Sequence, residues 1–176
     1  MKDLKKVFLS SVTLLLLNNT QAVAHDGTIN ITGDITDNTC IVSPDSKNFA
    51  VEMGNVASKQ FHQTGDATRY EPFSIYLEKC GAAASGVTVT FTGPTNSLNP
   101  DLLALNGGAG AATGMGLGIY NPDKTLLSIG KESEQTTLTP DEASVTLSFY
   151  ARYVADGASV TSGNANTSAT FLLTYA

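Results

Sequence analysis

Short runs of alternating apolar and polar residues recur along the chain and constrain its fold more than any other feature of the sequence. Every second residue is apolar over residues 145–153, and residues 169–175 repeat this spacing up to the end of the sequence. Successive side chains of a strand point to opposite faces, so this spacing predicts strands with one face in a core. Sustained helical spacing is missing from the rest of the chain after residue 24. The pattern therefore predicts an all-β sandwich.

The remaining runs place the other expected strands, which are separated by residues that favour turns. Loops are expected over Pro44–Asn48 and over the Gly/Ala-rich residues 107–114. The expected strands are residues 28–35, 40–42, 49–53, 73–80, 87–91, 102–105 and 117–119, with a weak strand at 125–129.

The first 24 residues have the organisation of a secretory signal peptide. Three lysines precede an apolar stretch, Val7–Leu17, and Ala22-Val23-Ala24 fits the small-x-small pattern of a cleavage site. The alternative is a membrane anchor, but the apolar stretch is shorter than the roughly 20 residues needed to span a bilayer. We therefore expect cleavage after Ala24 and an exported mature chain, beginning at His25, that does not insert into a membrane.

The charge of the chain excludes two classes of partner. The formal net charge is −6 at pH 7, and the segment before residue 25 contains three lysines and only one aspartate. The mature chain is therefore more acidic still. Binding to nucleic acid or to an anionic membrane surface requires clustered Lys and Arg, so neither partner is expected.

The chain contains two cysteines, Cys40 and Cys80, and both follow the predicted cleavage site. Disulfides form in the oxidising compartments that exported proteins enter. A bond between these cysteines would close a loop of about 40 residues and stabilise the fold by roughly 3–4 kcal/mol. A pair of free buried thiols remains the alternative.

The sequence offers no catalytic, metal-binding or cofactor-binding residues. Its only histidines are His25 and His62, and neither has a Cys or carboxylate at a recognised metal-ligand spacing. A hydrolase would have to use His62, and the chain lacks the nucleophile elbow that such a site would need. The glycines of residues 114–118 do not form the dinucleotide-binding pattern. We therefore expect a protein that is not an enzyme and has no cofactor.

Both ends of the expected sandwich carry an unusual strand. The last strand reaches the penultimate residue, Tyr175, so no later segment covers its outer edge, and folded monomers normally avoid uncovered apolar edges. At the other end, residues 28–35 have a strongly apolar face. This segment could pair within its own chain as an ordinary first strand, which the alternation alone favours. Alternatively, the sandwich lacks one strand and the segment fills the groove of another copy by β-augmentation.

Several motifs, taken in order after the signal peptide, resemble the type 1-like pilins of the chaperone–usher pathway over the whole mature chain. Each motif is weak by itself, and their order makes the resemblance specific. They are T-I-N-I-T-G-D-I, D-N-T-C around Cys40, F-S-I-Y-L-E-K-C, V-T-F-T-G, L-L-A-L, L-S-F-Y-A-R-Y, Gly163 and the closing A-T-F-L-L-T-Y-A with its penultimate Tyr.

The resemblance implies an incomplete immunoglobulin-like sandwich that lacks its last strand. It implies three parts: a signal peptide over residues 1–24, a donor-strand extension over 25–38 and a pilin domain over 39–176. It also implies three partners, which are a periplasmic chaperone, an outer-membrane usher and neighbouring pilus subunits. The chain would pass through the periplasm and end in a fimbrium at the cell surface that supports adhesion.

The resemblance also assigns roles to individual residues. The donor strand would point Ile29, Ile31, Gly33 and Ile35 inward. The acceptor groove, which the chaperone would contact first, would involve Gly163, Ala169, Phe171, Leu173 and Tyr175, and basic chaperone residues would hold the carboxylate of Ala176. Cys40 and Cys80 would form the disulfide of the family.

The sequence indicates the position of the chain within a fibre less clearly than it indicates the family. The short extension and low charge slightly favour a minor tip adaptor over a major rod subunit, and a chain-terminating subunit stays open. A tip adhesin would need a further receptor-binding domain, for which the mature chain has no room. The alternative of another class is a self-complete, secreted carbohydrate-binding module, which would be a stable monomer without a chaperone.

Overall fold

The computed structural model describes residues 29–35 and 37–176. The predicted signal peptide lies outside the described residues. The chain divides into two units between residues 35 and 36.

The described part of the first unit, residues 29–35, is not assigned to any strand. Its three isoleucines are almost fully exposed, at 87% for Ile29, 91% for Ile31 and 102% for Ile35. The sequence predicted a strand here. An alternating pattern gives a segment the capacity to pair, but a strand also requires a hydrogen-bonded neighbour.

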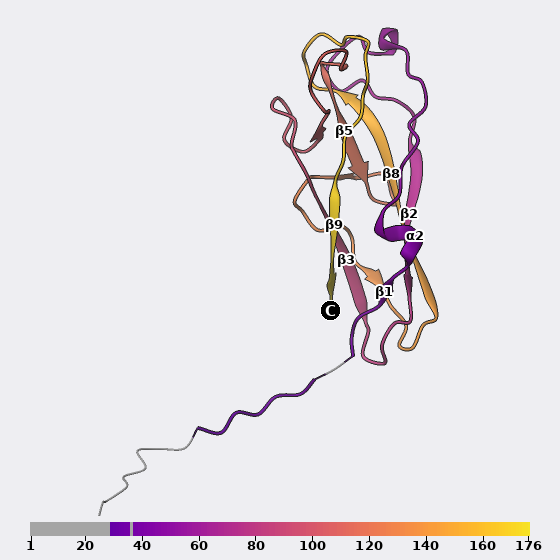
Figure 1. The fold of residues 1–176 in the computed structure, drawn as a ribbon, viewed down its shortest axis with the longest axis vertical. Coiled ribbons are helices and arrows are strands. Elements are labelled where there is room, and N and C mark those ends of the chain that lie inside the picture. The colour runs from indigo at the N-terminus through magenta and orange to yellow at the C-terminus, as the bar shows by residue number, and fades with distance from the viewer. Residues whose placement is uncertain (1–28, 36) are drawn as a thin grey trace, which may run out of the picture. The chain divides into compact units, whose positions relative to one another are not determined.

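The second unit consists of two antiparallel sheets, which Figure 1 shows as arrows. The larger sheet follows the order β1 (Ile41–Val42), β2 (Glu71–Glu78), β8 (Ser144–Ala155), β5 (Met115–Tyr120) and β4 (Leu103–Ala104), and β6 (Leu126–Leu127) also pairs with β5. The smaller sheet follows the order β7 (Thr136–Thr137), β3 (Gly86–Thr92) and β9 (Thr170–Tyr175).

The pairing registers of the long strands bring their apolar residues together in one core. In the larger sheet Phe73 pairs with Phe149 and Ile75 with Leu147, so the apolar faces of β2 and β8 coincide. In the smaller sheet, three such pairs join β3 and β9: Val87–Tyr175, Val89–Leu173 and Phe91–Phe171. The apolar residues of both sheets form one core cluster, which confirms the predicted sandwich.

Two local predictions were wrong. Pro44–Lys47 forms a short helix, α2, where a loop was expected. Proline at the first helical position is pre-organised for a helix, and the buried Ser46 hydroxyl accepts a hydrogen bond from the Tyr76 amide at 2.8 Å. Residues 49–53 were expected to form a strand, but they have no strand assignment, although Val51 and Met53 alternate with exposed neighbours as the pattern predicted.

The remaining elements are short. A 3-10 turn, η1 (Ser58–Gln60), interrupts the polar stretch after residue 54, which was expected to be irregular. The strand β7 was not predicted, because two threonines carry no alternating pattern. None of the helices in the described ranges is long and apolar enough to span a bilayer.

Candidate functional site

Among the residues that the structure describes, the last strand, β9, has one edge without a partner strand. It hydrogen-bonds to β3 on one side and is the terminal strand of its sheet. Its side chains alternate along its length, with Phe171, Leu173 and Tyr175 half-buried against the core and Leu172 65% exposed. A free edge presents unpaired backbone N–H and C=O groups, which can template a further strand.

An apolar groove of about 1260 Å³ begins beside the first half of this strand. One rim is residues 161–171, and the other rim is the segment that follows α2, residues 47–56. In Figure 1 these segments are the yellow chain leading into β9 and the indigo-to-purple chain leading away from α2. The floor consists of core side chains from both sheets, among them Phe73, Phe91, Leu103, Leu117 and Ile119.

Aromatic contacts hold this floor together. The rings of Phe91 and Phe149 lie edge to face with centroids 5.1 Å apart, and Phe73 lies 6.0 Å from Phe91 and 5.7 Å from Phe149. Phe49, on the rim after α2, lies 6.1 Å from Phe73. The groove is therefore an opening onto the hydrophobic core of the sandwich.

The rim that leads into β9 is fixed by hydrogen bonds to another loop. The Thr167 hydroxyl donates to the Ala104 carbonyl at 2.6 Å, and the Asn106 amide donates to the Asn166 carbonyl at 2.7 Å. The Tyr153 hydroxyl adds a third bond, which it donates to the rim carbonyl of Ala165 at 2.6 Å. Burial raises the pKa of Tyr153 above its ordinary value near 10, so its hydroxyl keeps the proton that it donates.

Gly163 allows the same rim to approach its neighbour closely. A Cβ at this position would lie 2.5 Å from the carbonyl carbon of Ala111 and from the amide nitrogen of Ala112. Next to it, the Asn164 amide donates to the Gly110 carbonyl at 2.8 Å. Any side chain at residue 163 would therefore push the rim away from residues 110–112 and change the width of the groove.

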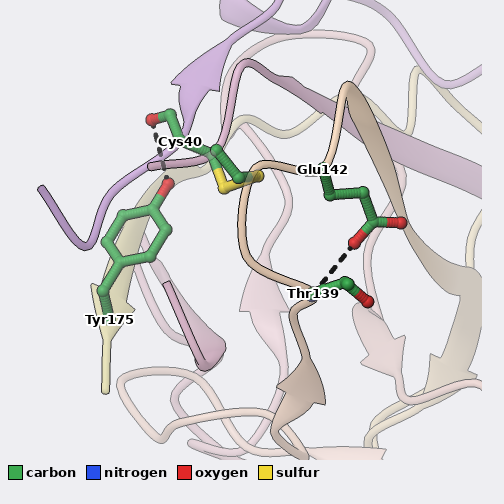
Figure 2. Close-up of a disulfide and its surroundings, with 5 residues drawn as sticks. Cys40, Thr139, Glu142 and Tyr175 are labelled. Atoms are coloured by element: carbon green, nitrogen blue, oxygen red, sulfur yellow. Dashed lines mark hydrogen bonds between the residues drawn. A yellow bond between two sulfur atoms is a disulfide. The ribbon is translucent and has the colours of Figure 1, made fainter. Parts of the chain in front are cut away.

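The end of β9 is hydrogen-bonded to the backbone of the disulfide residue Cys40. Cys40 and Cys80 form the predicted bond, with their Cα atoms 3.9 Å apart, and Figure 2 shows the Tyr175 ring reaching the Cys40 carbonyl. The Tyr175 hydroxyl donates to this carbonyl at 3.1 Å, and burial raises the pKa of Tyr175. The terminal residue, Ala176, donates its amide to Gly86 and accepts a bond from the Ser85 hydroxyl.

The groove residues expected from the sequence divide between the groove itself and the core beside it. Gly163, Ala169 and Phe171 line the groove, whereas Leu173 and Tyr175 pack against the core further along β9. The rim after α2 was missed, and its one signal was the alternation of residues 49–53. His62 is exposed. Across residues 29–35 and 37–176, no group of three or more His, Cys, Asp or Glu is placed to hold a metal ion.

Comparisons with known proteins agree on one family. The family described as fimbrial protein matches residues 29–176. Long polar fimbria protein A of Salmonella typhimurium is 38% identical, with 97% of this chain and 96% of the relative covered. The probable major fimbrial subunit LpfA of Escherichia coli O157:H7 is 35% identical, with 98% and 97% covered.

A structural comparison agrees with the sequence matches. A solved structure of a chaperone–usher pilus superimposes with a TM-score of 0.64 at 27% identity, with 86% of this chain and 96% of that chain covered. Its subunits have an immunoglobulin-like fold, as the sequence predicted for this chain. Proteins of this family are structural subunits of surface fimbriae rather than enzymes. The chain therefore belongs to the fimbrial protein family, the subunits from which chaperone–usher pili are built.

Proposed function

We propose that this chain polymerises by donor-strand complementation. Residues 29–35 of one subunit enter the groove of its neighbour, and its own groove accepts the same segment of the next subunit. The observation that carries the proposal is the free edge of β9 beside an opening onto the core, in a chain that also has an exposed segment with alternating isoleucines.

The two features are chemically complementary. The donated segment would add a strand to the edge of β9, and neighbouring strands of an immunoglobulin-like sheet run antiparallel. Ile29, Ile31 and Ile35 would then point toward the phenylalanines of the floor. Full burial of an isoleucine side chain contributes about 1.5–3 kcal/mol, and backbone hydrogen bonds along the edge set the register.

Gly33 interrupts the isoleucines on the same face of the segment. A Cβ at this position meets no atom within 4 Å, so the isolated segment does not require glycine there. The requirement would lie in the partner: a residue without a side chain can pass a narrow part of the groove during strand exchange. In this proposal Gly33 is a donor residue rather than a turn.

The same groove gives a reason for this chain to need a chaperone and an usher. A chain whose core is open would aggregate during export unless another strand covered it. A periplasmic chaperone would lend that strand, contacting Ala169, Phe171, Leu173 and Tyr175, and its basic residues would bind the carboxylate of Ala176. At an outer-membrane usher the next subunit would then replace the chaperone strand.

Deletion of residues 29–35 tests the proposal in the full export system. The groove lies within residues 42–171 and is intact in this variant, so the complex with the chaperone should form at the wild-type level. Incorporation behind a preceding subunit should be lost. Fibre incorporation is measured by electron microscopy and by immunoblots of sheared fimbriae, and normal incorporation of the variant would contradict the proposal.

We further propose that the chain occupies the rod. The slight preference for a tip adaptor came from the short extension and low charge, whereas a relative that matches over nearly its full length bears the name of a probable major fimbrial subunit. Immunogold labelling should then mark fibres along their whole length. Labelling confined to one end would instead favour the adaptor.

A further inference from the structure

We infer that the loop beside the disulfide is a contact surface for the preceding subunit of the fibre. This surface, the linker face, consists of the exposed residues Asp37, Thr39, Ala82 and Ala83. The inference rests on donor-strand complementation and adds a second, non-covalent interface to it. Three observations carry it: the anchoring of residues 37–40, a glycine that permits this anchoring, and the length of chain that precedes it.

Residues 37–40 are fixed to the loop 80–83 at three points. The Gly81 amide donates to the Thr39 carbonyl at 2.9 Å, and the Ala83 amide donates to the Asp37 carbonyl at 2.9 Å. The disulfide of Cys40 and Cys80 adds a covalent bond at the end of this pairing. The chain is therefore held to the sandwich from Asp37 onward.

Gly81 makes this anchoring possible. A Cβ at residue 81 would overlap the carbonyl oxygen and the carboxyl group of Asp37. Gly81 is buried, and because the nearest atom is the backbone oxygen of Asp37, the overlap cannot be relieved by a side-chain rotation alone. Glycine at this position is thus required for the close contact that fixes the point where the chain leaves the domain.

The free chain before this point is very short. Only one residue, at position 36, separates Ile35 from Asp37. Two residue steps span at most about 7 Å. If Ile35 lies in the groove of the preceding subunit, Asp37 is held within that distance of the groove, and the linker face must pack against the subunit that contains it.

The composition of the linker face suits close packing. Its loop presents Ala82 and Ala83, whose small side chains let two backbones approach, and the next residue, Ala84, is fully buried. In the isolated subunit a larger side chain at residue 82 would extend into solvent. In the fibre it would meet the preceding subunit, where overpacking of a close interface is destabilising.

Ala82→Arg in the full chain tests this interface. We expect normal recovery of the chaperone-bound subunit and an about tenfold loss of polymer, because a clash of this kind weakens association by about that factor. A second variant adds Gly-Ser-Gly-Ser between residues 36 and 37, which lengthens the free chain by up to about 14 Å. Combining the insertion with Ala82→Arg should restore polymer to the level of the insertion alone. Ser148→Arg, an exposed substitution in the middle of β8, is the matched control and should polymerise normally.

The outcomes separate this inference from the proposed function. Wild-type polymer yield for Ala82→Arg, or a loss that the insertion does not rescue, would overturn the linker face while leaving strand donation intact. Polymer formed by the chain without residues 29–35 would instead overturn strand donation itself. Polymer yield is measured by size-exclusion chromatography, and the amount of folded subunit is measured by its complex with the chaperone.

Discussion

Ile31→Asp is expected to lower the yield of polymer by about a thousandfold or more. The substitution removes the central isoleucine of the donated segment, whose burial contributes about 1.5–3 kcal/mol. It also places a carboxylate against the phenylalanines of the groove floor, and the one basic residue among the described lining residues, Lys47, lies on the rim after α2 and not on the floor. Burial of an unpaired charge costs several kcal/mol more, so the two effects together exceed the roughly 4 kcal/mol that a thousandfold loss requires.

Thr32→Asp is the matched control for this prediction. Residue 32 is adjacent to Ile31 but lies on the opposite face of the expected strand, which points to solvent after donation. Its yield of polymer should stay within about twofold of wild type, the size of a typical surface substitution. Both variants should bind the chaperone as the wild type does. Equal polymer yields for the two aspartate variants would contradict the assigned face of the donor strand.

The long strands of the sandwich could be predicted from the sequence because one face of each strand is buried. Phe73, Ile75 and Leu77 alternate along β2, and Val145, Leu147 and Phe149 alternate along β8. Burial of one face imposes this pattern on a strand. The same reasoning placed β9, because Phe171, Leu173 and Tyr175 alternate with exposed residues along it.

The walls of the groove were harder to predict, for a different reason. The rim over residues 161–168 is held by hydrogen bonds to residues 104–113, and polar contacts between distant loops leave no periodic pattern in the sequence. The other rim does have a pattern, in Phe49, Val51 and Met53, but its backbone lacks a strand assignment. A strand is defined by its partner, and the pattern of one segment cannot supply that partner.

The linker face could not be predicted from the sequence either. Gly81 is one of 16 glycines in the chain, and its sequence neighbours do not reveal that its missing side chain makes room for Asp37. Only the close approach of the two backbones shows this. The disulfide beside it could be expected from the predicted export of the chain, because an oxidising compartment favours the bond between its two cysteines.

Complementation by a free peptide tests most directly whether the fold needs a strand from another molecule. The measurement is the thermal unfolding of the chain lacking residues 29–35, with and without a peptide of residues 26–38. At a peptide concentration about a thousandfold above its Kd, ligand binding stabilises the folded state by about 4 kcal/mol, which corresponds to a rise in Tm of roughly 10 °C or more for a domain of this size. The same peptide carrying Ile31→Asp should leave the Tm unchanged.

The structure predicts that the native peptide forms a one-to-one complex with the truncated chain and raises its Tm, because an added strand on β9 would cover the opening onto the core. A truncated chain that unfolds cooperatively at the same temperature with and without the peptide would already possess a closed core. That result would contradict donation of a strand between subunits.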